Sequence, residues 1–262
     1  MNLTIQEIID GILAETPYKA GDDTVDTVKT GNPRDAVTGI VTTFLASYEV
    51  LEKTVKAGAN FVITHEPTFY THRDETEWLA KDPVYLAKRR FIDEHKLVIW
   101  RFHDYWHRHQ PDGITTGVVR ALGWEAILEH GSPSFCNLPS MTLAATAAHV
   151  KKKLGATGLR IIGDPEMVCK RAALLLGACG GKPQIEALGR PDVDVLLCGE
   201  IHEWETNEYV RDAISLGRKK ALLVLGHAAS EEAGMSYLAE RLRERIPVPI
   251  THIPTGDAMR PA

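Results

Sequence analysis

Histidines and carboxylates recur directly after apolar, strand-like runs of this sequence. The residues at four such positions are His65 and Glu66, His103 and His107, Glu200 and Glu203, and His227 and Glu231. Imidazole nitrogens and carboxylate oxygens are the ligands that suit zinc, manganese and iron. The pattern therefore predicts that the protein binds a divalent metal ion at the ends of buried strands.

The prediction depends on the recurrence rather than on any one residue. A single histidine at a strand end is more often a polar side chain that meets solvent. In open α/β sheets, however, ligands gather at the carboxyl ends of strands, so several such ends can meet if the strands adjoin. The segment from His103 to His109 has a second interpretation, as a basic and aromatic surface loop. His72, His95, His130, His149 and His252 lack a comparable setting, and we expect them to be structural or solvated.

His227 and Glu231 form the most specific local pattern. Their i, i+4 spacing places both side chains on one face of a helix that begins at once. Ser230 and Glu231 could instead serve as the N-cap and a first-turn acid of that helix. The two interpretations are compatible, because a capped helix can hold a ligand rigidly.

The sequence lacks the glycine-containing motifs that are typical of two large enzyme classes. The run Gly177-Ala-Cys-Gly-Gly181-Lys182 resembles a phosphate loop, but Leu176 occupies the first glycine position and Pro183 follows the lysine. A tight turn from strand to helix is the interpretation that we favour. The sequence contains neither a Gly-x-Ser-x-Gly elbow nor a Rossmann fingerprint, which argues against serine hydrolases and dinucleotide enzymes.

Strand-like and helix-like segments alternate along the chain, which predicts an α/β protein with mainly parallel sheets. The predicted strands are residues 37–46, 60–64, 96–102, 172–178, 193–198 and 221–225. The predicted helices begin with a capping box at Thr4 and then cover residues 48–56, 78–95, 114–122, 141–154, 205–215 and 230–245. A turn-rich break at residues 129–139 divides the chain into halves of residues 1–128 and 129–262. We expect the halves to pack as one compact unit with the metal site between them.

The composition limits the cellular location and the classes of binding partner that we expect. The 262 residues carry a formal net charge of -5, which offers no footprint for nucleic acid or an anionic membrane. No apolar run approaches the ~18 residues of a membrane span, and the first residues do not resemble a signal peptide. The four cysteines form no Cys-x-x-Cys pair, which argues against a zinc knuckle and fits a reducing, cytoplasmic location.

The strand ends together resemble a known family. Ile63-Thr-His65-Glu-Pro, Phe102-His103-x3-His107, Gly177-Ala-Cys-Gly-Gly181, Cys198-Gly-Glu200 and Gly226-His227-Ala-Ala-Ser-Glu231 occur in the order of the NIF-three-like dinuclear-metal proteins, also known as GTP cyclohydrolase 1 type 2. The resemblance implies two related α/β halves, a pair of metal ions per chain and a hexameric assembly. It implies the metal ligands His65, Glu66, His103, His107, His227 and Glu231. Two of these depart from the family pattern, since Glu66 replaces a histidine and His107 replaces an aspartate.

These observations lead to two functional hypotheses. The first is a metal-dependent hydrolase whose dinuclear site of zinc, iron or manganese activates water for attack on a small, nucleotide-like substrate. Glu200 or Glu203 would be the general base, and His109 or His202 an acid or a substrate contact. The second is a non-catalytic, metal-binding scaffold or regulator. In either case we expect a homo-oligomer, because the family is hexameric and because Phe69, Tyr70, Tyr105 and Trp106 fall in segments expected to be exposed loops.

Overall fold

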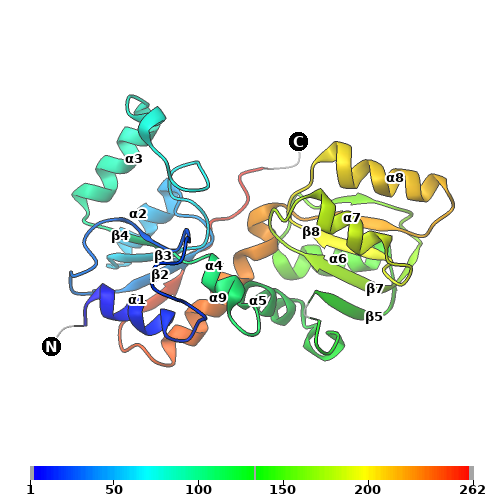
Figure 1. The fold of residues 1–262 in the computed structure, drawn as a ribbon, viewed down its shortest axis with the longest axis horizontal. Coiled ribbons are helices and arrows are strands. Elements are labelled where there is room, and N and C mark those ends of the chain that lie inside the picture. The colour runs from blue at the N-terminus through cyan, green and yellow to red at the C-terminus, as the bar shows by residue number, and fades with distance from the viewer. Residues whose placement is uncertain (1–2, 133, 260–262) are drawn as a thin grey trace. The chain divides into compact units, whose positions relative to one another are not determined.

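The chain folds into two units, and each unit is built from two separate segments of the sequence. The computed structural model describes residues 3–132 and 134–259 (Figure 1). One unit comprises Met1–Ile114 and Gly234–Thr255, and the other comprises Thr115–Ala233 and Gly256–Ala262. The predicted division at residue 128 differs from this one, because helices α5 (Gly113–Leu122) and α9 (His227–Arg243) each continue from one unit into the other.

A five-stranded sheet forms the centre of the first unit, with the strand order β1-β4-β3-β2-β10. Its strands are β1 (Val28–Thr30), β2 (Ile40–Thr43), β3 (Phe61–Thr64), β4 (Val98–Arg101) and β10 (Ile250–His252). Four of them run parallel, and β1 pairs with β4 in the antiparallel direction. The sequence predicted β2, β3 and β4, whereas the short edge strands β1 and β10 were not predicted.

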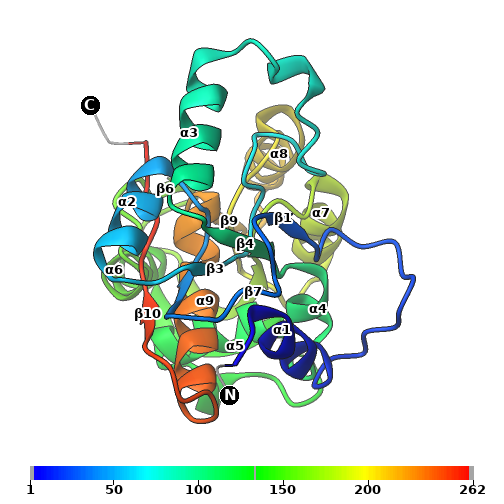
Figure 2. The same ribbon diagram turned by 90° about the vertical axis from the view of Figure 1, so that its left-hand side faces the viewer.

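Helices cover both faces of this sheet. They are α1 (Ile5–Leu13), α2 (Tyr48–Lys56), the 3-10 helix η1 (Glu77–Leu79), α3 (Pro83–Glu94) and the short α4 (Asp104–Arg108). Because side chains alternate along a strand, Val62 of β3 packs into the core formed with α2 and α3, while its neighbours face the opposite side. Figure 2 shows α2 and α3 on one side of the sheet and α1 with the end of α9 on the other. The predicted capping box at Thr4 and Glu7 is confirmed.

The second unit also contains a five-stranded sheet, with the order β5-β7-β8-β9-β6. Its strands are β5 (Phe135–Thr142), β6 (Arg160–Ile162), β7 (Val168–Leu175), β8 (Val195–Cys198) and β9 (Ala221–Val224). The three central strands are parallel, and both edge strands are antiparallel. Strand β5 lies in the segment whose composition predicted turns. Its pairing with β7 shifts register between Asn137 and Met141, around Pro139, which hides the alternation of an ordinary strand.

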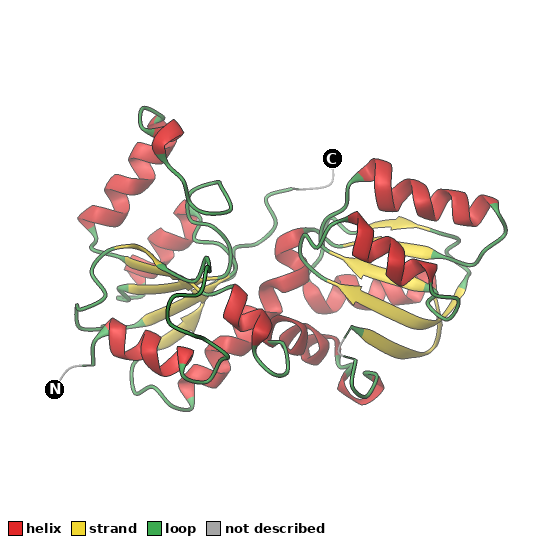
Figure 3. Cartoon of the chain, viewed as in Figure 1, coloured by secondary structure: helices red, strands yellow, loops and turns green. Residues whose placement is uncertain are grey.

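Helices also cover both faces of the second sheet (Figure 3). They are α5, the 3-10 helix η2 (Glu125–Ile127), α6 (Leu143–Leu154), α7 (Gly181–Gly189), the π-helix η3 (Glu203–Asn207), α8 (Glu208–Ser215) and the start of α9. Helices α5 and α6 share one apolar core with the sheet, and α7 and α8 share the other. The predicted α/β class is therefore confirmed, with two mixed sheets whose central strands are parallel.

The expectation that four aromatic residues are exposed is wrong for three of them. Phe69, Tyr105 and Trp106 are at most 2% exposed, and only Tyr70, at 54%, is open to solvent. The sequence pattern did not predict helix α4, which turns Tyr105 and Trp106 inward. There the ring centroid of Trp106 lies 5.7 Å from that of Phe102. Within the described residues, no helix is both long enough and apolar enough to span a membrane.

Candidate metal centre

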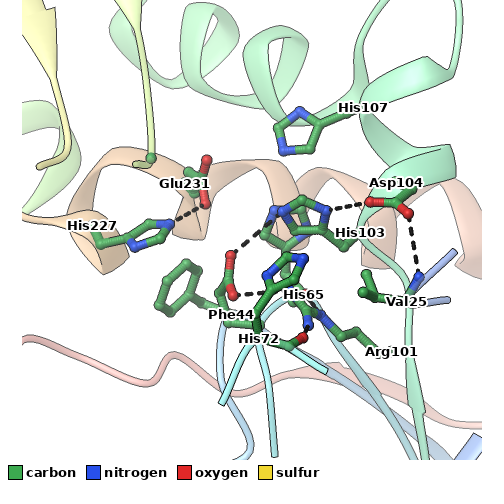
Figure 4. A network of polar contacts seen from close by, with 12 residues as sticks. Val25, Phe44, His65, His72, Arg101, His103, Asp104, His107, His227 and Glu231 are labelled. Atoms are coloured by element: carbon green, nitrogen blue, oxygen red, sulfur yellow. Dashed lines mark hydrogen bonds and ion pairs between the residues drawn. The ribbon is translucent and has the colours of Figure 1, made fainter. Parts of the chain in front are cut away.

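Three histidines of the first unit converge at the carboxyl end of its sheet. His65 follows β3, His103 follows β4, and His107 lies on α4, one helical turn after His103. Strands β3 and β4 are parallel and pair Thr64 with Arg101, so both strand ends reach the same edge. Each ring offers a nitrogen within 4.8 Å of a nitrogen of the other two, and the ring centroids lie 4.5 to 5.0 Å apart (Figure 4). The structure thus brings together three of the predicted ligands.

The Nδ1 atom of each of these rings faces an oxygen that can only accept a hydrogen bond. His65 Nδ1 lies 3.2 Å from the Phe102 carbonyl oxygen. His103 Nδ1 lies 2.9 Å from Asp104 Oδ1, and His107 Nδ1 lies 2.9 Å from Asp112 Oδ2. Nδ1 must therefore carry the proton in each neutral ring, which places the lone pair on Nε2. This tautomer, fixed by an outer carboxylate or carbonyl, is the one that metal-binding histidines adopt.

Glu66 places a carboxylate oxygen beside His103. Its Oε2 lies 3.1 Å from Nη2 of the fully buried Arg101, and its Oε1 lies 3.5 Å from His103 Nε2. Because His103 carries its proton on Nδ1, two acceptor atoms face each other across this 3.5 Å gap, an arrangement that a cation stabilises. Ligand bonds to zinc of about 2.0–2.2 Å place neighbouring donor atoms at about this separation.

The position of His103 depends on two aspartates that the sequence analysis did not single out. The buried Asp26 accepts the backbone N–H groups of His103, Asp104 and Tyr105, at 2.7 to 2.9 Å, and so stabilises the first turn of α4. Burial raises the pKa of Asp26 despite these three donors. Asp104, in turn, accepts a hydrogen bond from the Thr24 hydroxyl and another from the Val25 N–H (Figure 4). No spacing rule in the sequence connects residues 24–26 to residue 103.

The local environment keeps His103 neutral at physiological pH. Burial, reinforced by the neighbouring His65, lowers the pKa of His103 to about 3, even though its bond to Asp104 acts in the opposite direction. Burial tends to raise the pKa of Asp104, but hydrogen bonds from His103 and Thr24 outweigh it and hold that pKa at about 2. A neutral imidazole beside an ionised carboxylate is the protonation state that metal binding requires.

A second group of predicted residues lies in the second unit. His227 is the first residue of α9, with its Nε2 3.2 Å from Glu231 Oε2 one turn later (Figure 4). Its Nδ1 lies 2.8 Å from Glu200 Oε1, so the ring has a carboxylate at each nitrogen. The helix begins three residues before Ser230, so the alternative in which Ser230 is its N-cap is wrong. Ser230 instead accepts the Gly177 N–H and donates to the His227 carbonyl.

The glycine loop before α7 is a strand-to-helix turn, as we favoured, and it also packs against this pair. Gly177 has a φ of +62°, and a Cβ atom there would lie 2.2 Å from Glu231 Oε1. Only glycine allows the backbone to approach the carboxylate so closely in this conformation.

Other predicted residues have surface or structural partners. Glu203 forms an exposed ion pair with Arg160, at 2.9 Å, and His202 stacks on Trp204. His109 is nearly buried, and its Nδ1 lies 2.8 Å from the Pro111 carbonyl oxygen. The ring of His72, expected to be structural or solvated, lies 6.4 Å from that of His103.

Known proteins resemble this chain over nearly its whole length. A GTP cyclohydrolase 1 type 2 homolog of Clostridium perfringens is 22% identical over 271 residues, covering 99% of this chain and 98% of the relative. A protein with the same description from Escherichia coli (strain K12) is 26% identical, covering 84% and 85% of the two chains.

Solved structures share the fold. A hypothetical protein of Staphylococcus aureus superposes with a TM-score of 0.80 at 17% identity, covering 100% of both chains. A Bacillus cereus protein related to NIF3 gives 0.76 at 15% identity, covering 98% of each. The sequence model of the family described as Duf34/NIF3 (NGG1p interacting factor 3) matches residues 4–256, and the chain therefore belongs to this family.

Proposed function

We propose that this protein is a metal-dependent hydrolase of small polar substrates. The observation that carries the proposal is the arrangement at His103, whose Nε2 lone pair faces Glu66 Oε1. His103 lies in a cluster of three imidazoles, each with its Nδ1 facing an oxygen. Nitrogen-rich sets with one carboxylate suit zinc, iron or manganese. A divalent ion held there would supply Lewis-acid chemistry that polarises a substrate oxygen.

The first-unit ligands in this proposal are His65, Glu66, His103 and His107. His227 and Glu231 of the second unit offer the same donor types, and Glu200 Oε1 lies 2.8 Å from His227 Nδ1. That both groups serve one centre with two ions remains a prediction. The general-base roles of Glu200 and Glu203 also remain predictions, and the contact between Glu200 and His227 favours an orienting role for Glu200.

The substrate class rests on the names of the relatives alone. Several are described as GTP cyclohydrolase 1 type 2 homologs, which favours a nucleotide or a related heterocycle. The same donor set would also serve a metal-binding scaffold without turnover, so the assay must separate the two functions.

The test begins with chelator-stripped protein, to which zinc, manganese or iron is added back. A panel of nucleotide, phosphoester and amide substrates is then assayed with each metal. We expect hydrolysis of at least one substrate that depends on metal and is lost in His103→Ala. Metal binding without turnover across the panel would support the scaffold, and an absence of metal binding would refute both functions.

A further inference from the structure

Arg101 is a fully buried arginine at the last position of β4, directly beside the candidate metal centre. Its Nε donates to the His65 carbonyl oxygen at 3.0 Å, and its Nη1 donates to the His72 carbonyl oxygen. Its Nη2 donates to Glu66 Oε2 at 3.1 Å. Burying a guanidinium is costly unless its donors are satisfied. The three bonds therefore fix the loop that carries His65 and Glu66 in one place.

The contact with Glu66 is asymmetric. Arginine commonly binds a carboxylate through two parallel N–H···O hydrogen bonds. Here Arg101 Nη2 donates to Glu66 Oε2, while Nε and Nη1 donate to backbone carbonyl oxygens. The other carboxylate oxygen, Oε1, stays directed toward His103 Nε2, 3.5 Å away.

We propose that Arg101 is the positioning residue of this centre and holds Glu66 so that Oε1 alone serves as a ligand beside His103. This inference rests on the proposed metal binding. Arg101 also offsets the charge of Glu66, and the other donors are the imidazole nitrogens of the three histidines. Calcium and magnesium favour sites built from several anionic oxygens, whereas nitrogen-rich sites suit cobalt and zinc. The centre should accordingly select cobalt or zinc over magnesium or calcium.

Lys88, on helix α3, provides a matched control that contacts the same loop. It is 3% exposed, and its Nζ donates to the Thr68 carbonyl oxygen at 2.6 Å. Its ammonium group also lies over the rings of Phe69 and Tyr70. Like Arg101, Lys88 is a buried cation that donates to a backbone carbonyl of the loop. Unlike Arg101, it is bonded to Thr68 and not to Glu66, so Lys88→Met tests the loss of such an anchor alone.

The experiment measures Co²⁺ binding to the full chain, by affinity and by the visible absorption spectrum. We expect Arg101→Met to raise the Kd by about 10–100-fold, as the loss of an outer-sphere partner does. Glu66→Gln, which replaces a ligand, should raise it at least as much, and both variants should change the spectrum. The double variant should be no weaker than the weaker single variant, because Arg101 acts through Glu66. Lys88→Met should lose thermal stability while keeping the affinity and the spectrum of the wild type.

The outcomes separate this inference from the proposed function. Failure of the wild type to bind Co²⁺ would refute the metal centre and the role of Arg101 together. Normal binding by the wild type and by the Arg101 variants, or effects that multiply in the double variant, would refute the role of Arg101 alone. If Arg101→Met does not fold, Arg101→Lys decides the question. It keeps the buried charge but cannot reproduce three diverging bonds, so it should also bind Co²⁺ more weakly.

Discussion

At the scale of single residues, hydrogen-bond acceptors orient the predicted histidines as ligands. The Nδ1 of each faces an oxygen, and these oxygens belong to Phe102, Asp104, Asp112 and Glu200. Strand-end position predicted the histidines and Glu200 but not the other acceptors, because these are a backbone carbonyl and two aspartates at irregular spacings. The acceptors matter because they select the tautomer that leaves Nε2 as the donor.

The two departures from the family pattern give a prediction at this scale. Glu66→Gln should weaken metal binding sharply, because an amide is a poorer ligand than a carboxylate. His107→Asp should retain metal, since either side chain can ligate. It would, however, place a second carboxylate near Asp112, which now contacts His107 Nδ1 at 2.9 Å.

Adding Asp112→Asn to His107→Asp should therefore restore affinity relative to His107→Asp alone. Isothermal titration calorimetry with zinc measures the affinity of all three variants and of the wild type. Wild-type affinity in Glu66→Gln would show that Glu66 is not a ligand.

Lys88 gives a prediction about pH. Burial lowers the pKa of Lys88 to about 8 from 10.5. Between these values the unfolded chain holds a proton on Lys88 that the folded chain has lost. The free energy of unfolding should therefore rise with pH in this window, by at most about 1.4 kcal/mol per unit from this group.

Below pH 8 the contribution should be flat. Urea unfolding of the wild type and Lys88→Met, compared from pH 7 to 10, isolates the effect. Equal slopes for the two proteins above pH 8 would contradict it.

At the scale of elements, the central strands and the long helices could be predicted from the sequence, while the short connecting elements could not. β3 and β8 are continuous apolar runs that are buried along their whole length, so their pattern is unambiguous. Helix α4 has five residues, and its first turn is stabilised by Asp26, which lies 77 residues before His103. Such a helix depends on a tertiary contact, which local patterns do not contain.

The Gly177 turn gives a prediction at the element scale. Gly177→Ala should destabilise the fold by about 1–2 kcal/mol through its positive φ, and further through the clash with Glu231. It should also reduce metal binding. Gly155, with a φ of +65° and open space around its Cβ position, is the matched control, because Gly155→Ala adds strain without the clash. Chemical denaturation and metal titration compare the two variants. Equal losses of stability and of metal affinity in both would show that the close approach of Gly177 to Glu231 has no special role.

At the scale of the whole molecule, we predict that copies of the chain associate into a homo-oligomer. Exposed apolar side chains support this in each unit, namely Tyr70, Trp78 and Val84 in the first, and Trp204 and Leu216 in the second, all at least 54% exposed. Where such side chains form a contiguous patch, they often mark an interface. Light scattering at micromolar concentration should give a mass several times the 29.0 kDa of one chain. A mass near 29.0 kDa would contradict the prediction.

The central claim is that the folded chain binds divalent metal through the predicted histidines and carboxylates. The most direct test is elemental analysis of untagged protein purified without chelator, compared with His103→Ala, His227→Ala and Glu231→Ala. His149→Ala is the control, since His149 Nε2 lies 2.8 Å from the Leu122 carbonyl oxygen and the ring stacks on Trp124. We predict at least about one zinc, iron or manganese ion per wild-type or His149→Ala chain, and loss of most of it in the other three variants. Wild-type protein that stays free of metal after dialysis against these ions, or ligand variants that retain all of it, would contradict the claim.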